Sequence, residues 1–353
     1  MTAEQTTANA TANTPDTTAV PGQRARTPRV RGRLVVTFLA ALTGCGALLA
    51  LAMGSSEIAL PEIIAATAGQ GDSGTVFIVQ QLRLPRVLAA LAVGAALGAS
   101  GLLLQGLLRN PMASPDVIGV TSGASLATVV AIGAAVPPLG LPVAAACGAG
   151  IATTLLQVIN SRTSAAGSRL VLIGIGLHAA ASAGVALTMA RLPIGRLGAA
   201  EVWLAGSLHA RNWVHVTAAT IGLAVALPAA FWLLRRLAVL ELGDDLAIGA
   251  GVPVRRTRAG LLAFSAVLAG IAVAVAGPIA FVALGAPHIA RRIVGPTRAA
   301  TLTAAVLIGA FLVLAADVIG QRLFAPTALA AGVVTAALGA PYLLWLLHRM
   351  GRR

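Results

Sequence analysis

The chain has 353 residues, of which 58% are apolar and only 10% are charged. Because soluble domains typically carry about 25% charged residues, this composition excludes a soluble globular protein. The net charge of +14 does not indicate a nucleic-acid binder, since the arginines punctuate hydrophobic runs instead of gathering on one polar segment.

The apolar residues are chiefly Ala, Leu, Val and Ile, accompanied by 39 glycines. Small residues let helices pack closely inside a bilayer, whereas the strands of a membrane barrel would show an alternation that these runs lack. We therefore predict an all-α fold, a polytopic protein of the cell membrane.

The first 33 residues are rich in Thr, Ala and Pro and end in a cluster of arginines. Such a composition cannot bury a core, so we expect a disordered, Arg-rich cytoplasmic tail over 1–33 and a transmembrane domain over 34–353. A signal peptide is the alternative. The apolar run 34–54 is longer than a typical signal-peptide core and lacks a clear cleavage site, which favours a first membrane span.

A membrane span needs about 20 mainly apolar residues, and Gly or Pro within it is tolerated. Ten segments meet this description. They are approximately 34–54, 86–107, 116–136, 141–160, 168–190, 214–234, 257–276, 278–294, 299–321 and 329–348.

An even number of spans places both termini on the same side of the membrane. With the Arg-rich tail in the cytoplasm, 19 of the 25 basic residues fall inside, as the positive-inside rule requires. Six arginines are then external: Arg83, Arg86, Arg191, Arg196, Arg211 and Arg322. They indicate an acidic partner outside the cell. For any single one, snorkelling to the membrane interface is the alternative.

The connection 235–258 is the longest expected between spans in the cytoplasm, and the densest in charge. Its middle, 242–250, predicts a short helix, because Asp244 and Asp245 would lie in the first turn, where the helix dipole favours carboxylates, and Gly251 would end it. Such a helix could dock into a partner. The alternative is a solvated connector whose charges only keep it out of the bilayer.

Several polar or small residues within or beside the spans are interpreted as structural. Asp317 is interpreted as a hydrogen-bonded structural acid in preference to a proton relay. His178 is predicted to face the helix bundle, and Gln105 to bond between helices or line a path. Asp116 is interpreted as a helix-start residue. Cys45 and Cys147 are predicted to be small core residues, because they are not grouped with histidines as metal ligands would be.

Four sequence blocks resemble the FecCD-type permease subunits of binding-protein-dependent ABC importers, which carry ferric siderophores, haem or cobalamin. The blocks are RLPR at 83–86 with LLLQGLLRNPMASPDVIGVTSGAS, LAGS at 204–207, ELGDDLAIGAGV, and AGPIAFVALGAPHIARRIVGP with AADVIGQRLFAPTALAAGVVTAALGAPYLLWLL. The resemblance runs from about Leu34 to the C-terminus. It implies a type II ABC importer permease of about ten helices that is not itself an enzyme.

The resemblance also implies the partners. These are a second permease subunit, identical or paralogous, two cytoplasmic ATPases and an external substrate-binding protein. The chain has no lysine with which to build a Walker A loop, so ATP would be used by the partner subunits, and no cofactor or metal is expected on this chain. A ferric siderophore is the first-choice cargo, with haem and cobalamin as alternatives.

Two other classes remain as alternatives. An ion-coupled secondary transporter would normally show several intramembrane carboxylates or broken helices around a midplane site. A membrane enzyme would show acids, histidines or metal ligands converging near one membrane face.

The resemblance assigns roles to three sets of residues. Docking of the binding protein falls to Arg83, Arg86 and Arg322, although the family's third arginine aligns with Gln321, and a shift of one residue on a helix turns a side chain by about 100°. Coupling to the ATPase falls to Leu242, Gly243, Asp244, Asp245, Ala247 and Gly251. A cytoplasmic gate falls to Gly167 and Ser168, which also fit a helix N-cap.

Overall fold

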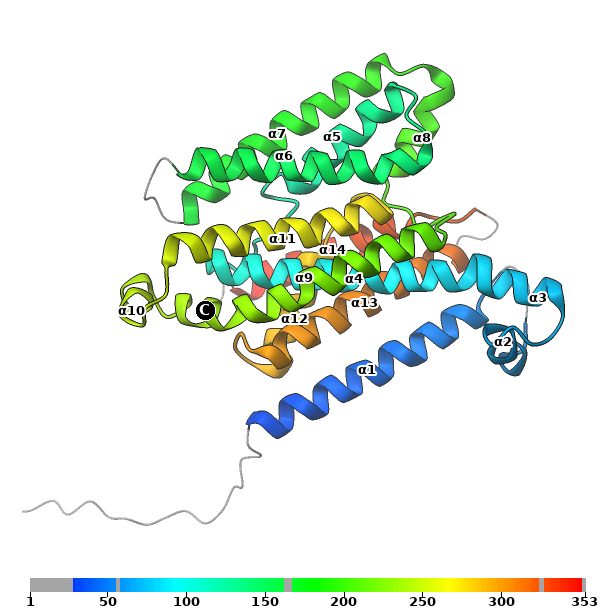
Figure 1. The fold of residues 1–353 in the computed structure, drawn as a ribbon, viewed down its shortest axis with the longest axis horizontal. Coiled ribbons are helices and arrows are strands. Elements are labelled where there is room, and N and C mark those ends of the chain that lie inside the picture. The colour runs from blue at the N-terminus through cyan, green and yellow to red at the C-terminus, as the bar shows by residue number, and fades with distance from the viewer. Residues whose placement is uncertain (1–27, 55–57, 162–166, 324–326, 351–353) are drawn as a thin grey trace, which may run out of the picture.

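The computed structural model describes residues 28–54, 58–161, 167–323 and 327–350. All regular secondary structure within these ranges is helical, which confirms the predicted all-α class (Figure 1). The α-helices are α1 (Pro28–Ala52), α2 (Leu60–Thr67), α3 (Ser73–Phe77), α4 (Leu84–Leu108), α5 (Val120–Gly133), α6 (Leu141–Ser161), α7 (Gly167–Arg191), α8 (Ile194–Leu204), α9 (Trp213–Leu240), α10 (Asp244–Gly249), α11 (Val254–Ala276), α12 (Val282–Val294), α13 (Ala299–Arg322) and α14 (Ala331–Met350).

Each of the ten predicted spans corresponds to one of these helices. Within the described residues, seven helices are long and apolar enough to cross a membrane, in α1, α4, α6, α7, α9, α11 and α13. Helix α1 begins at Pro28, ahead of the predicted start at residue 34, and residues 1–27 of the predicted tail lie outside the described ranges.

Two of the other helices are shorter than the sequence predicted. Helix α5 has 14 residues and α12 has 13, which at 1.5 Å per residue covers only about 20 Å of a hydrocarbon layer about 30 Å thick. The residues that precede each helix form non-helical backbone, over 109–119 and 277–281. Glycines with positive φ interrupt the helical geometry there, at Gly119 (φ 82°) and Gly277 (φ 74°).

Helices α4 and α13 form the centre of the molecule, and small residues let their backbones approach closely. A Cβ added at Gly94 would lie 2.2 Å from the carbonyl oxygen of Gly309, and one at Gly98 would lie 2.1 Å from that of Ala305. Close packing through small residues is the usual source of helix association in lipid, where the surroundings are as apolar as the helix surface.

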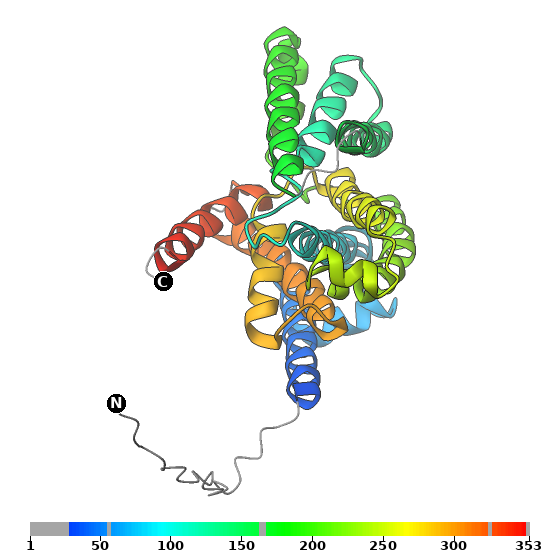
Figure 2. The same cartoon turned by 90° about the vertical axis from the view of Figure 1, so that its left-hand side faces the viewer.

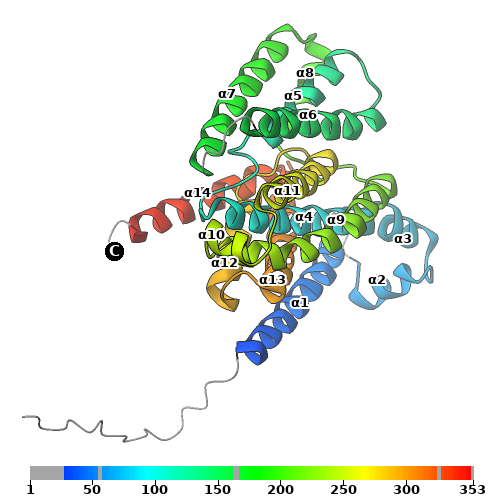
Figure 3. The same cartoon turned by 60° about the vertical axis from the view of Figure 1, so that its left-hand side comes forward.

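The helices divide into two layers, seen in all three views (Figures 1, 2 and 3). Helices α5 to α8 form one layer, and the remaining helices form the larger body, with α11 between the two. Each layer has its own hydrophobic cluster. The cluster of the smaller layer includes Leu262, Ala266 and Val273 from α11, so this helix joins the layers.

The elongated molecule has two ends, named here for the short helices that mark them (Figure 1). The α10 end holds the start of α1 and the end of α9. The α3 end holds α2, α3 and the start of α14, where the Gly332 amide donates to the Gly206 carbonyl at 2.9 Å. Since α1 begins and α14 finishes toward the α10 end, the even number of crossings predicted from sequence is consistent with the fold.

One prediction about small residues is wrong. Cys45 and Cys147 are exposed on the surface of this chain instead of buried in its core. In a membrane protein the surface that faces lipid or another subunit is as apolar as the interior, so an apolar run alone cannot tell the two locations apart.

Candidate functional site

At the α3 end, Arg86 on α4 is paired with Asp317 on α13. Its Nε and Nη2 donate to the two carboxylate oxygens at 2.9 Å each, and the Asp317 side chain is only 5% exposed. Gln321 donates its Nε2 to the same carboxylate at 2.8 Å. Bidentate, charge-assisted bonds are strong, and they let an acid lie within an apolar helix. The prediction that Asp317 is a hydrogen-bonded acid is confirmed.

Arg83 precedes α4 in a π-helical turn (Ile78–Arg83) and is buried against the end of α1. Its Nη1 donates to the carbonyl oxygens of Leu51 at 2.8 Å and Ala52 at 3.3 Å. A Cβ at Gly54 would lie 2.2 Å from its Nη2, so the guanidinium occupies the space that a glycine leaves. Arg83 is therefore held by its own chain.

Arg322, the last residue of α13, is exposed and close enough for its charge to act on Arg83. The structure therefore brings the three predicted docking arginines to the same end of the molecule, in different environments. Arg83 and Arg86 bond within the chain, and Arg322 faces outward.

A further arginine, Arg211, lies in the connection from α8 to α9. Its Nη2 donates to the Ser207 carbonyl at 3.2 Å, and its guanidinium carbon lies 5.6 Å from the centroid of the Trp203 ring. Burial lowers the pKa of Arg211, because a charged group loses hydration there. Arg211 is thus a partly buried cation that anchors this connection.

At the α10 end, Asp244 begins helix α10 and is bound by two arginines from other segments. Arg258 donates its Nη2 to both carboxylate oxygens at 2.8 Å, and Arg109 donates to Oδ1 at 2.9 Å. Arg109 also donates to the Leu240 carbonyl. Asp244 thereby fixes α10 against the ends of α4 and α11.

Arg109 reaches Asp244 from an unusual backbone position. It follows the last residue of α4 with φ 49°, in the left-handed region that residues other than glycine seldom adopt. This turn ends α4 and directs the chain into the non-helical segment 109–119. The termination of α4 and the anchoring of α10 therefore involve the same residue.

Glu241, which directly follows α9, makes a second set of bonds at this end. It accepts a hydrogen bond from Thr297 Oγ1 at 2.7 Å and pairs with Arg291 Nη2 at 3.4 Å. A Cβ at Gly106 would lie 2.9 Å from its Oε1, so α4 passes directly beside it. Together, Glu241 and Asp244 connect the α10 loop to four other segments of the chain.

The predicted coupling residues differ in exposure and backbone conformation. Leu242 is 70% exposed, Asp245 is exposed, and the neighbouring Leu246 and Ile248 are 62% and 64% exposed. Ala247 is fully buried against the body of the molecule. Gly243 (φ 133°) and Gly251 (φ 76°) form the turns on either side of α10. The predicted short helix is confirmed, and it exposes two large apolar side chains, Leu246 and Ile248.

The predicted gate residues lie at the start of α7, which begins at Gly167. The segment 162–166 and the side chain of Ser168 lie outside the described residues. The gate assignment therefore stays a prediction.

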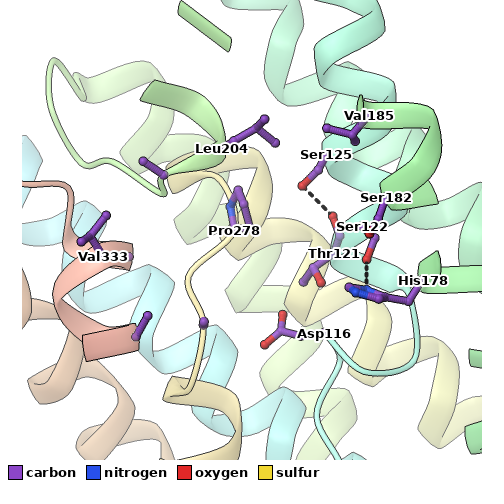
Figure 4. A pocket seen from close by; sticks show the side chains of 14 residues that line it. Asp116, Thr121, Ser122, Ser125, His178, Ser182, Val185, Leu204, Pro278 and Val333 are labelled. Carbon is purple, nitrogen blue, oxygen red and sulfur yellow. Dashed lines mark hydrogen bonds between the residues drawn. The ribbon is translucent and has the colours of Figure 1, made fainter. Parts of the chain in front are cut away.

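A cavity of about 540 Å³ lies between the smaller layer and helix α14. Figure 4 shows the polar side chains gathered on one side of it, together with Val185, and other apolar side chains on the opposite side. The polar wall consists of Asp116, Thr121, Ser122, Ser125, His178 and Ser182. Its apolar counterpart includes Leu204, Pro278 and Val333.

Within the polar wall, hydrogen bonds join α5 to itself and to α7. Ser122 Oγ is bonded to His178 Nδ1 between the two helices, and Ser125 Oγ donates to the Thr121 carbonyl at 2.9 Å. His178 therefore faces α5, as predicted, but its side chain is exposed and lines the cavity instead of being enclosed by the bundle. Gln105 was predicted either to bond between helices or to line a path. The structure supports the first, since its Nε2 donates to the Leu284 carbonyl on α12 at 3.0 Å.

The interpretation of Asp116 as a helix-start residue is wrong. The N-cap of α5 is Gly119, which makes no side-chain capping bond, and Asp116 lines the cavity instead. The difference arises because turns occupy 115–119 and delay the start of the helix.

Sequence reasoning missed the roles of Arg109, Glu241, Arg258 and Arg291. The available signal was the scarcity of acids, since the whole chain has only 11, and three of them, Glu241, Asp244 and Asp245, stand within this short loop. A buried or half-buried acid in a membrane protein normally has a basic partner. The identity of that partner depends on the fold, because Arg109 and Asp244 are 135 positions apart.

No group of three or more His, Cys, Asp or Glu side chains gathers in the described part of the chain in a way that could hold a metal ion. The carboxylates of Glu241, Asp244 and Asp317 are bonded to arginines, to the Thr297 hydroxyl and to the Gln321 amide.

Comparison with known proteins supplies the family. The model of the FecCD transport family matches residues 41–349. This chain belongs to the FecCD transport family. The resemblance found in the four sequence blocks is therefore confirmed, and the chain is a multi-pass membrane permease of this family.

FecCD relatives align along almost the whole chain. The probable siderophore transport system permease protein YfhA of Bacillus subtilis (strain 168) is 41% identical over 324 residues, covering 89% of this chain and 94% of the relative. The ferric enterobactin transport system permease protein FepG of Escherichia coli (strain K12) is 39% identical, covering 92% and 99%. The hemin transport system permease protein HmuU of Yersinia pestis is 35% identical, covering 91% and 97%.

The FecCD fold is also found among solved structures. A metal-chelate type ABC transporter in an inward-facing conformation superposes with a TM-score of 0.82 at 29% identity, covering 90% of this chain and 99% of that one. This similarity agrees with the type II ABC importer architecture predicted from sequence.

Proposed function

We propose that this chain is the membrane permease subunit of an ATP-driven importer of ferric siderophores. The supporting observation is the full-length similarity to permeases named for siderophore and ferric enterobactin transport, at 41% and 39% identity. Haem is the alternative cargo, supported by the 35% identity to a hemin permease. A second permease subunit, identical or paralogous, completes the translocation path.

Helix α10 is the proposed contact for the ATPase subunits. Leu246 and Ile248 on α10, and Leu242 just before it, are large exposed apolar side chains that water disfavours and a groove on a partner would cover. Asp245 adds an exposed charge beside them. The α10 end then faces the cytoplasm, together with the start of α1 and the end of α14.

The bonds of Glu241 and Asp244 suggest how movement of the ATPases reaches the membrane helices. A displacement of α10 pulls on Arg109 at the end of α4 and on Arg258 in α11 through Asp244. It pulls on Arg291 in α12 through Glu241. Because α4 lies at the centre of the fold and both α11 and α12 pack against it, ATP binding and hydrolysis on the partners change access to the path.

The opposite, α3 end is the proposed docking surface for an external binding protein. Arg322 is exposed and can meet an acidic side chain directly. Arg83 and Arg86 place two further positive charges at this end, and Arg86 is already paired with Asp317. Docking at Arg86 therefore involves competition between an external carboxylate and Asp317.

An ion-coupled secondary transporter is the competing class. Such a transporter needs an intramembrane carboxylate that can bind and release the coupling ion. Asp317 is bonded to both Arg86 and Gln321, which leaves it poorly suited to that role.

Reconstitution tests the proposal. The permease is assembled with its ATPase and second permease subunit in lipid vesicles, and the binding protein is added outside with a radiolabelled ferric trihydroxamate chelate. Uptake that requires ATP is the expected result. ATP-dependent uptake of haem alone would favour the alternative cargo, and uptake driven only by an ion gradient would overturn the ABC importer assignment.

A further inference from the structure

The cavity beside α5 and α7 is formed where two helices are interrupted. The chain is non-helical over 109–119, before α5, and over 277–281, before α12. Non-helical backbone at membrane depth is tolerated only where it is buried in protein or lines a cavity that water can enter. Asp116 from the first interruption and Pro278 from the second both line this cavity.

The second interruption is held firmly by its neighbours. A Cβ at Gly277 would lie 2.3 Å from the Trp203 carbonyl oxygen, and one at Gly206 would lie 2.2 Å from that of Pro278. The 277–281 segment is thus packed directly against the end of α8 and the turn that follows. The apolar wall is part of the fixed structure of the chain.

The two walls of the cavity differ in chemistry. Asp116, Ser125 and Ser182 bring hydrogen-bonding groups from the 109–119 segment, α5 and α7, and Figure 4 places them opposite Leu204, Pro278 and Val333. Ser125 donates its hydroxyl proton to the Thr121 carbonyl, and its oxygen can still accept a hydrogen bond from a ligand. A cavity with one polar and one apolar wall suits a ligand that has both kinds of surface.

The size of the cavity also fits a ligand. Sites for small molecules generally have volumes of about 300 to 1,000 Å³ and combine an apolar lining with a few polar groups that fix orientation. The cavity of about 540 Å³ falls within that range and has the same mixture of side chains. It is too large to be a packing defect or the site of one bound water.

We propose that this cavity is a cargo-contact site on the translocation path. Asp116, Ser125 and Ser182 hydrogen-bond the amide or hydroxyl groups at the periphery of a polar iron chelate, and Leu204, Pro278 and Val333 contact its apolar side. The bond from Ser122 to His178 positions α7 for this contact. The inference rests on the proposed import function and adds to it a specific place and class of ligand.

The first test measures transport in the reconstituted complex. The double variant Ser125→Ala/Ser182→Ala removes two hydroxyls from the polar wall and adds no bulk. Each lost hydrogen bond should lower the amount of ferric trihydroxamate imported per ATP hydrolysed by roughly twofold to tenfold. The matched control is Thr188→Ala on α7, the helix that carries Ser182. The Thr188 hydroxyl bonds to the Gly184 carbonyl of α7 and lies outside the cavity.

The second test measures occupancy without relying on activity. In a chain carrying Cys45→Ser and Cys147→Ser, a thiol is introduced by Ser182→Cys or, as the control, by Thr188→Cys. During turnover with the ferric trihydroxamate, reaction of a small thiol reagent should slow at position 182 and stay unchanged at position 188.

The outcomes separate this inference from the function on which it rests. Unchanged labelling at position 182, or unchanged import per ATP in the double variant, overturns the cargo-contact site while import by the wild-type complex still stands. A wild-type complex that imports no ferric chelate overturns the proposed function, and the cargo-contact site with it.

Discussion

Arg86 and Asp317 are 231 positions apart in the sequence, yet they form a bidentate ion pair that joins α4 to α13 at the α3 end. The pair carries two functions at once if Arg86 also receives a binding protein. Its structural contribution can be measured separately from docking, since unfolding of the permease does not require the partner.

The substitution Asp317→Asn should destabilise the permease. Removing one partner of a buried pair leaves the other charge uncompensated, which costs about 3 to 5 kcal/mol when both are fully buried. Arg86 is 20% exposed, so the lower part of that range is expected. Thermal unfolding in detergent measures the effect, and Gln321→Ala should lower the melting temperature less. An unchanged melting temperature for Asp317→Asn would contradict the structural role.

Arg322 offers the opposite case, a charge whose loss should affect docking only. Arg322→Glu should weaken binding-protein affinity about tenfold, which corresponds to about 1.4 kcal/mol, without changing the melting temperature. The loss should shrink at high salt, because exposed charges are screened. Binding to permease in nanodiscs measures it, and Arg322→Lys serves as the control that keeps the charge. Equal affinity for the Glu and Lys variants would remove Arg322 from the docking surface.

The exposed apolar side chains on and just before α10 predict where the ATPase binds. Leu242→Asp with Leu246→Asp should sharply lower co-purification of the ATPase, because both side chains are largely exposed and a charge would oppose burial in a groove. The melting temperature of the isolated permease should stay the same. Glu62→Gln on α2, at the opposite end of the molecule, is the control for a change of charge alone. Normal ATPase recovery from the double variant would support the solvated-connector interpretation.

Asp244 should affect the coupling of ATP hydrolysis to import, whereas Leu242 and Leu246 should affect binding of the ATPase. Its pairs are about 40% exposed, so Asp244→Asn should cost no more than about 1 kcal/mol of stability per pair. The ATPase should still bind, and import per ATP should fall because α10 is less firmly tied to α4 and α11. Measurement of both uptake and hydrolysis decides the matter. A wild-type ratio of the two would show that Asp244 does not transmit movement.

The close approach of α4 and α13 gives a test of the fold itself. Gly94→Ala should reduce the yield of folded permease and cost several kcal/mol, because its Cβ would meet the Gly309 carbonyl at 2.2 Å. Gly150→Ala is the matched control, since no atom lies within 4 Å of a Cβ there. It should be tolerated or slightly stabilising, as alanine favours helix over glycine. Comparable yields for the two variants would contradict the packing of α4 on α13.

Local features were predictable from the sequence. The spans follow from runs of apolar residues, and α10 follows from two acids in the first turn and a glycine just after the end. The four blocks of residues were sufficient to suggest the family. Each of these signals lies within a few tens of consecutive residues.

Features that depend on distant residues were not predictable. The helices α5 and α12 are shorter than their predicted spans, because apolar residues such as Val117 and Ile118 before α5, and Ile279 and Ala280 before α12, extend each apolar run beyond the helix. The exposure of Cys45 and Cys147 could not be predicted either, since lipid-facing and core positions have the same apolar composition. The partners of Asp244 and Asp317 come from other helices, and neither pairing leaves a local pattern.

The exposure of the ion pairs has a consequence for handling the protein. Arg86 and Asp317 are mostly shielded from solvent, whereas the two pairs of Asp244 are about 40% exposed. At 1 M salt the screening length falls to about 3 Å, which weakens exposed pairs far more than shielded ones. High ionic strength during purification would therefore loosen the α10 end and leave the α3 end intact. The resulting permease would keep a normal melting curve, although the ion pairs of Asp244 that hold α10 were already weakened.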